Sequence, residues 1–194
     1  MTKVGFAITS SFCSISKVLE PIQQLVDAGY EVIPITSPAV IEVDTRFGEA
    51  KKFKEVIEKM TNKQIVSTIV EAEKFGPKEQ LDVLVVAPAT GNFIAKFANG
   101  ITDNTVNMAV KATMRNNKPI VIGVSTNDGL GLNEENIMKL LNNKNIYFIP
   151  FGQDDCKNKP NSLVAHFDLL LPTIEEALNN HQYQPLIKEY KKIK

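Results

Sequence analysis

Apolar runs alternate along this chain with segments whose apolar residues recur at helical spacing. Runs rich in Val and Ile predict strands, and the unbroken run over 81–87 is typical of a strand buried on both faces. Because five or six such runs alternate with helical segments, we expect an α/β fold built on a doubly wound parallel sheet. The predicted strands are 3–8, 31–35, 81–87, 119–124 and 145–151.

Two helices are predicted from their apolar faces. The first covers about 15–26, where Pro21 should introduce a kink and Gly29 follows the end of the helix. The second covers about 49–60 and is expected to bury four apolar side chains: Phe53, Val56, Ile57 and Met60.

Local signals assign three further segments. The β-branched segment 64–70 favours a short strand. Thr102 or Asp103 is the expected N-cap of a helix after the central strand. Thr173 and Glu176 have the spacing of a capping box, which predicts a final helix.

Composition and charge limit the class of protein. We expect one domain over 1–194 with a helical tail from about 160 to 194, because no repeat or low-complexity linker marks a boundary. Lys+Arg and Asp+Glu both number 22, so the balanced charge indicates neither nucleic acid nor a membrane surface as partner. No apolar run approaches the roughly 18 residues of a membrane span, and the first strand starts almost at Met1, so we expect a cytoplasmic protein without a signal peptide. Cys13 and Cys156 are far apart in sequence, so we expect reduced thiols and no zinc site.

Polar bends follow three of the predicted strands. They are Thr9–Ser14 after the first strand, Thr36–Ser37 after the second, and Thr90–Asn92 after Pro88, which is expected to end the central strand. Carboxyl ends of parallel strands meet at one edge, where helix N-termini and hydroxyl groups can hold a phosphate. Ordinary N-capping explains the first bend equally well. The G-x-G-x-x-G and Walker A patterns are absent, so a mononucleotide is a better fit than NAD or ATP.

The central motif resembles that of a known family. Pro88-Ala89-Thr90-Gly91-Asn92, followed by Lys96, Gly100 and Asp103-Asn104, is similar to the PA[ST]xNxxxKxxxGxxDN signature of FMN-binding flavoproteins, which include cysteine decarboxylases of coenzyme A and lantibiotic biosynthesis. The resemblance covers most of the chain and implies FMN as cofactor. The cofactor contacts that it implies are Thr9, Ser10, Ser11, Phe12, Ser37, Pro88, Ala89, Thr90, Asn92, Lys96, Asn104 and Asn127.

Further stretches resemble one branch of that family whose members work with a second, different protein. They include 65–77, 123–128, 151–154, 159–165 and 182–185. This resemblance implies a flavodoxin-like, Rossmann-like three-layer sandwich that assembles as a homo-oligomer, a trimer or a multiple of trimers. It also implies oxidation of a dihydrodipicolinate-type precursor, a small dicarboxylic substrate, to pyridine-2,6-dicarboxylate in the mother cell of a sporulating bacterium. The hydride acceptor would be FMN, or NAD(P) on the partner.

The chain departs from the decarboxylases at two places. Their histidine before the central motif is missing, since this chain has only His166 and His181, and their later clamp survives only as Asn127. Decarboxylation is therefore disfavoured as the activity, although it remains an alternative, as does a non-catalytic role in which the chain activates its partner. Glu71 and Glu73 are the nearest candidates for proton transfer, against the simpler interpretation that both are solvated.

Six other side chains are considered for a role in the site. Lys96 could meet a phosphate or carboxylate, or point to water. Arg46 and Arg115 are candidate carboxylate clamps. Cys13 stands at a helix start, which can lower a thiol pKa, but a small buried side chain is the expected role. His166 is expected to pack within an apolar helix, and His181 to lie at the surface.

Overall fold

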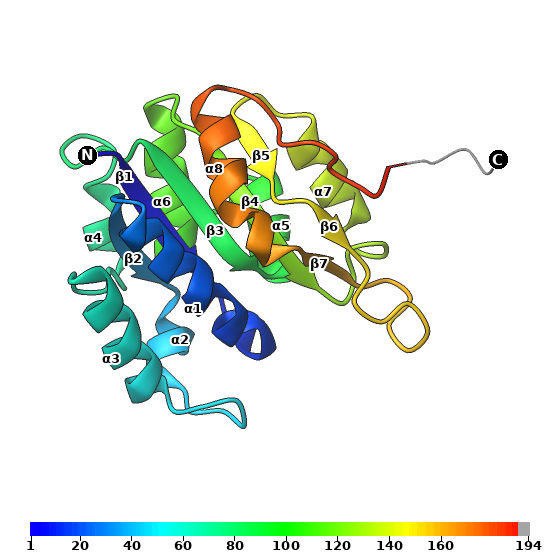
Figure 1. The fold of residues 1–194 in the computed structure, drawn as a ribbon, viewed down its shortest axis with the longest axis horizontal. Helices are drawn as coiled ribbons and strands as arrows, with labels where there is room; N and C mark the ends of the chain where they lie inside the picture. Colours follow the sequence, from blue (N-terminus) through cyan, green and yellow to red (C-terminus); the bar gives the residue numbers. More distant parts are fainter. Residues whose placement is uncertain (190–194) are drawn as a thin grey trace.

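The structure is a computed structural model that describes residues 1–189, and its centre is a seven-stranded sheet. Five strands form the predicted parallel sheet in the order β2-β1-β3-β4, with β5 also paired to β4 (Figure 1). Two short strands add an antiparallel part that the sequence did not predict: β7 pairs with the end of β4, and β6 pairs with β7. The strands are β1 Lys3–Ile8, β2 Glu31–Thr36, β3 Val83–Ala89, β4 Ile120–Thr126, β5 Ile146–Phe148, β6 Phe151–Gly152 and β7 Leu163–Ala165.

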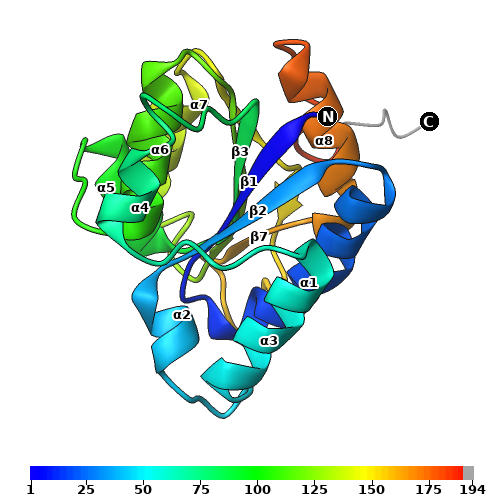
Figure 2. The same ribbon diagram turned by 90° about the vertical axis from the view of Figure 1, so that its left-hand side faces the viewer.

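Helices cover both faces of the sheet, so the predicted three-layer sandwich is confirmed. One face carries α1, α3 and α8, and the other carries α4, α5, α6 and α7 (Figure 2). Each helix layer closes over its own buried apolar cluster. The helices are α1 Phe12–Asp27, α2 Pro38–Glu42, α3 Ala50–Thr61, α4 Ile69–Glu73, α5 Gly91–Ala98, α6 Thr105–Arg115, α7 Glu134–Leu141, the 3-10 helix η1 Phe167–Leu169 and α8 Leu170–Leu178.

The central strand β3 is buried along its whole length, as its unbroken apolar run predicts. It does not end at Pro88. The strand continues to Ala89, and its pairing with β4 shifts register between Val86 and Ala89. A register shift is one of the few places where a sheet tolerates a residue without a backbone N–H, so the bend begins one residue later than predicted.

The segment 64–70 is mostly not a strand, and that prediction was wrong. Val66 forms only an isolated parallel bridge with Ile35, and α4 begins at Ile69. Thr68 and Glu71 form a capping box: the Thr68 hydroxyl accepts from the Glu71 N–H at 3.2 Å, and the Glu71 carboxylate accepts from the Thr68 N–H at 3.1 Å. These two side chains start a helix inside a β-branched segment.

Two predicted caps were also misplaced. Asn104, not Thr102 or Asp103, caps α6, because its side chain accepts from the Asn107 N–H at 3.0 Å. Thr173 lies inside α8, where its hydroxyl donates to the Leu169 carbonyl at 2.6 Å.

Other details depart from the predicted pattern in smaller ways. Val56 is 42% exposed although it was expected to be buried with Phe53, Ile57 and Met60. The expected helical tail is helical only in η1 and α8 among its described residues. Residues 190–194 of that tail lie outside the described part of the chain.

The C-terminal segment closes one edge of the sheet with a side chain. The Gln182 amide accepts from the Phe148 N–H at 2.8 Å and donates to the Phe148 carbonyl at 2.7 Å. Four residues later, the Leu186 carbonyl accepts from the Phe151 N–H at 3.3 Å. The backbone of β5 and β6 is thereby paired on a side where no further strand lies within the described residues.

Candidate functional site

The bends after β1 and β3 are joined by Thr9, which is 4% exposed. Its hydroxyl donates to the Pro88 carbonyl at 2.7 Å and accepts from the Thr90 N–H at 3.0 Å. The hydroxyl therefore has both a donor and an acceptor partner within the chain. Thr9 holds the two bends together, and Ser10 beside it is half-buried at the same edge.

The first turn of α1 leaves backbone donors free. Ser11 is the N-cap, but its side chain does not cap the helix; its Oγ lies 3.0 Å from Ser125 Oγ, which is also 2.9 Å from Ser14 Oγ. Among the described residues, no hydrogen-bond acceptor meets the N–H groups of Phe12 and Cys13. Free N–H groups at the start of a 16-residue helix favour an anion. Cys13 is exposed here, so the expectation of a buried thiol was wrong.

The bend after β2 contains two buried hydroxyls without partners. Ile8 and Thr36 are paired in the sheet, and the Ser37 N–H donates to the Ile8 carbonyl at 3.1 Å, so this bend lies beside Thr9. In the described part of the chain, neither Thr36 Oγ1 nor Ser37 Oγ has a hydrogen-bond partner. Leaving a buried hydroxyl unpaired costs about 1–3 kcal/mol. A ligand with acceptor oxygens would provide the missing hydrogen-bond partner for either hydroxyl.

The bend after β3 packs against the connection between β4 and α7. Thr90 caps α5, accepting from the Phe93 N–H at 3.3 Å, and Gly91 begins the helix. A Cβ on Gly91 would lie 2.6 Å from Asn133 Nδ2 and 2.8 Å from Asp128 Oδ1. Only glycine fits this close approach without displacing the connection.

Asp128 organises that connection. Its carboxylate accepts hydrogen bonds from the Thr126 hydroxyl and from Asn133 Nδ2, the latter at 2.8 Å. Asn127, between Thr126 and Asp128, is exposed beside the bend, as is Asn92 on α5. Sequence reasoning placed Ser14 in the first bend but did not assign Asp128 or Ser125 to the site, because nothing local shows that these two residues reach the bends after β1 and β3.

Lys96 and Asn104 belong to a second polar cluster at the start of α6. Lys96 Nζ lies 2.6 Å from Asp103 Oδ2 and holds the pKa of that carboxyl below its usual value. The Asn104 side chain bonds Asp103 and Asn107 as well as capping the helix. No described hydrogen bond links this cluster to the three bends, so the charge of Lys96 is directed to Asp103 rather than to water or to the bends.

The remaining candidates lie apart from the bends or are already engaged. The Thr68 hydroxyl, with the Ser67 and Thr68 N–H groups, lowers the pKa of Glu71, which fits a capping role better than that of a base. Arg46 lies over the Phe47 ring at 4.8 Å, and Arg115 and Glu73 are exposed on α6 and α4.

The expectation for His166 was wrong, and that for His181 is confirmed. His166 is exposed just before η1, so its expected packing inside a helix was wrong. His181 is at the surface, 3.5 Å from Glu176.

These residues fit a phosphorylated ligand. The free N–H groups of α1 and the unpartnered Ser37 hydroxyl belong to bends that follow two adjacent parallel strands. Ser10 and Thr90 are half-buried at the same edge of the sheet, here called the rim, whereas Ala89 is buried. No Lys or Arg is engaged at the three bends in the described hydrogen bonds or ion pairs, so a phosphate held there would depend on neutral donors and the α1 dipole.

Comparison with known proteins gives consistent results. The family model described as Flavoprotein matches residues 1–170. The B subunit of dipicolinate synthase from Bacillus subtilis (strain 168) is 50% identical over 187 residues, which is 96% of this chain and 94% of that protein. A crystal structure of the dipicolinate synthase B subunit from Bacillus halodurans superposes with a TM-score of 0.90 at 51% identity, covering 97% of this chain and 96% of the other. The FMN-dependent cysteine decarboxylase SpaF shares the fold, with a TM-score of 0.67 at 22% identity over 92% of this chain and 96% of its own.

Proposed function

This chain belongs to the flavoprotein family, and from that premise we propose that it is the B subunit of a dipicolinate synthase and binds FMN at the three bends. With the A subunit of dipicolinate synthase it oxidises a dihydrodipicolinate-type precursor to pyridine-2,6-dicarboxylate, in the cytoplasm of the mother cell of a sporulating bacterium. The near full-length match to the Bacillus protein supports this assignment. No helix in the described part of the chain is long and apolar enough to cross a bilayer.

The unpartnered Ser37 hydroxyl carries the proposal. It is buried beside the bend whose helix offers the free N–H groups of Phe12 and Cys13. In the proposed complex these groups donate to phosphate oxygens, while Thr9 keeps the β1 and β3 bends in register around the ligand. Thr9 therefore acts on the ligand through backbone geometry rather than by direct contact.

FMN supplies an acceptor for the hydride that leaves the substrate ring. The chain positions the reacting groups. Asp128 holds the β4–α7 connection against Gly91, so the rim keeps one shape when a substrate binds. The A subunit completes the substrate site and could instead carry NAD(P) as the final acceptor. The chain works as a homo-oligomer, a trimer or a multiple of trimers.

Flavin binding by the purified full chain tests the proposal. We expect visible flavin bands, or quenching of FMN fluorescence on titration, and at least a tenfold weaker Kd in Ser37→Ala, because a hydrogen bond to a charged phosphate is worth about 1.5–3 kcal/mol. Ser16→Ala, which removes an exposed hydroxyl on the same α1, is the matched control and should bind normally. A chain that fails to bind FMN, or variants that bind equally well, would overturn the proposed site.

A second assay addresses the reaction. When the A subunit and the precursor are both present, an aromatic ultraviolet chromophore should appear without release of carbon dioxide. Release of carbon dioxide from a cysteine-ended substrate by this chain alone would establish the decarboxylase alternative. A chromophore formed equally by Ser37→Ala would indicate that the partner carries the hydride acceptor.

A further inference from the structure

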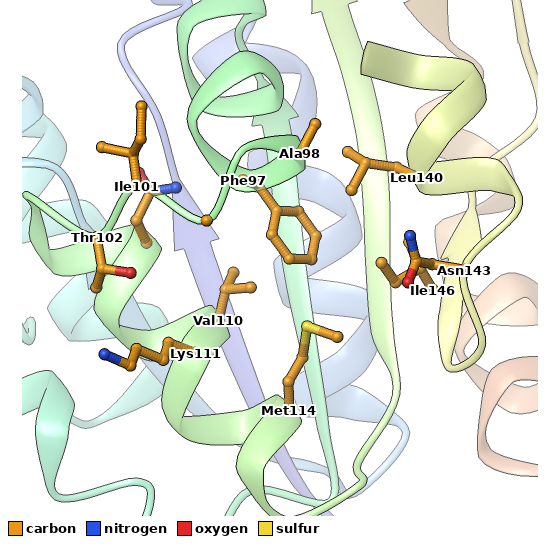
Figure 3. A pocket seen from close by; sticks show the side chains of 12 residues that line it. Phe97, Ala98, Ile101, Thr102, Val110, Lys111, Met114, Leu140, Asn143 and Ile146 are labelled. Carbon is orange, nitrogen blue, oxygen red and sulfur yellow. The ribbon is translucent and has the colours of Figure 1, made fainter. Parts of the chain in front are cut away.

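A groove separate from the three bends lies between α6 and α7, beneath the end of α5. Its volume is about 440 Å³, and its walls are mostly apolar. Figure 3 shows Phe97 directed between Val110 and Met114 of α6 on one side and Leu140 and Ile146 on the other. None of its lining residues belongs to the three bends.

One buried side chain lining the groove has a donor without a partner. Asn107 is 3% exposed. Its own N–H donates to Asn104 Oδ1 at 3.0 Å, which fixes Asn104 Nδ2 as the donor to Asn107 Oδ1 at 2.6 Å. The remaining group, Asn107 Nδ2, meets no acceptor among residues 1–189. Asn107 Nδ2 is therefore free to donate to an acceptor on a ligand in the groove.

The polar groups around the groove gather near Asn107. Lys111 is one helical turn further along α6 and forms no ion pair within the described residues. Figure 3 shows its amine directed away from Phe97, along the outer edge of the groove, and the Thr102 hydroxyl on the same side. Asn143 lies across the groove, with its Nδ2 donating to the Lys139 carbonyl at 2.9 Å. One end of the groove therefore offers a neutral donor and a nearby cation, and the remaining lining is apolar apart from Gly100 and Asn143.

We propose that this groove is a second ligand site, which binds a small aromatic carboxylate. The ring packs against Phe97, Val110 and Met114, and the carboxylate accepts from Asn107 Nδ2 beneath the positive charge of Lys111. A mostly apolar pocket of a few hundred Å³ with a few convergent polar groups is the usual form of a small-molecule site. The ligand could be the pyridine-2,6-dicarboxylate of the proposed reaction or an unrelated aromatic acid. The inference does not depend on FMN binding.

Methionine-methyl NMR of the full chain tests the site directly. Met114 lines the groove, and the other four methionines, which lie outside its lining, serve as internal references. Sodium benzoate should shift the Met114 methyl signal saturably, whereas the uncharged benzamide should bind more weakly. Tighter binding of pyridine-2,6-dicarboxylate than of benzoate would support the product as ligand, and the reverse order would support an unrelated acid.

Two variants and one control distinguish binding in the groove from a general effect of protein charge on benzoate affinity. Asn107→Asp keeps the acceptor for Asn104 but replaces the free donor by a negative charge, and we expect at least a tenfold loss of benzoate affinity. Lys111→Glu, at an exposed position, should also weaken benzoate without affecting benzamide. Asn179→Asp adds the same charge at the end of α8, on the other face of the sheet, and should bind normally.

Several results would overturn the inference. They are no saturable shift of Met114 with benzoate, equal binding of benzoate and benzamide, or unchanged binding in both groove variants. A Met114 signal that moves on dilution of the protein alone would also overturn it, because a second copy of the chain would then occupy the groove.

Discussion

Replacing Thr9 by Val tests how the rim is held together. The two side chains have similar shapes, so the substitution removes the hydroxyl with little change in packing. The Pro88 carbonyl keeps the Thr9 N–H at 3.3 Å, but the Thr90 N–H loses its acceptor. One unpaired, partly buried N–H should cost about 2 kcal/mol. For a chain of this size, each kcal/mol corresponds to about 2–4 °C in Tm.

Urea unfolding of the flavin-free chain measures this cost. The midpoint should fall with an unchanged m-value, since the folded and unfolded states keep their exposed surfaces. Thr113→Val is the matched control: Thr113 is also buried, but its hydroxyl donates to the Ala109 carbonyl within its own helix, and its loss leaves no N–H unpaired. If Thr9→Val costs no more than Thr113→Val, the hydroxyl does not hold the bends and the role given to Thr9 is wrong.

Three further outcomes follow from the same contacts. Gly91→Ala should displace Asp128 from its partners and lower both Tm and FMN affinity, measured by thermal unfolding and flavin titration; an unchanged FMN Kd would contradict the close packing. Because the pKa of Glu71 is lowered in the folded state, its contribution to stability is present above the pKa of the unfolded chain and is lost as pH falls through the folded pKa. Urea midpoints of wild type and Glu71→Gln should therefore converge in acid, and a constant difference would refute this. Lys96→Met should raise the pKa of Asp103 toward its ordinary value in a carboxyl NMR titration, and no change would show that the ion pair is not formed in solution.

The architecture could be predicted because the spacing of apolar residues along the chain indicates which side chains are buried. The unbroken run of β3 and the apolar face of α1 depend only on which side chains leave water, and they were assigned correctly; on α3 the prediction failed at Val56. Segments whose structure depends on one or two side chains were not assigned correctly. The Thr68–Glu71 pair starts a helix where β-branched residues favour a strand, and Asn104 prevails over two neighbouring candidates for the cap.

The site could be predicted only in its separate parts. The bends at Thr9, Ser37 and Thr90 could be located because each follows a strand in sequence. That they share one edge follows from the parallel sheet, but the contacts that join them could not be predicted. Thr9 bonds Pro88 and Thr90 some eighty residues away, and Ser11 and Ser14 meet Ser125 across more than one hundred residues. Whether a hydroxyl such as Ser37 is free or already paired depends on such contacts, which no local pattern records.

The Gln182 amide, bound to both backbone groups of Phe148, has a consequence for assembly. A neighbouring polypeptide cannot lengthen the sheet at β5 without first displacing this amide, so strand addition by another chain is blocked at this edge.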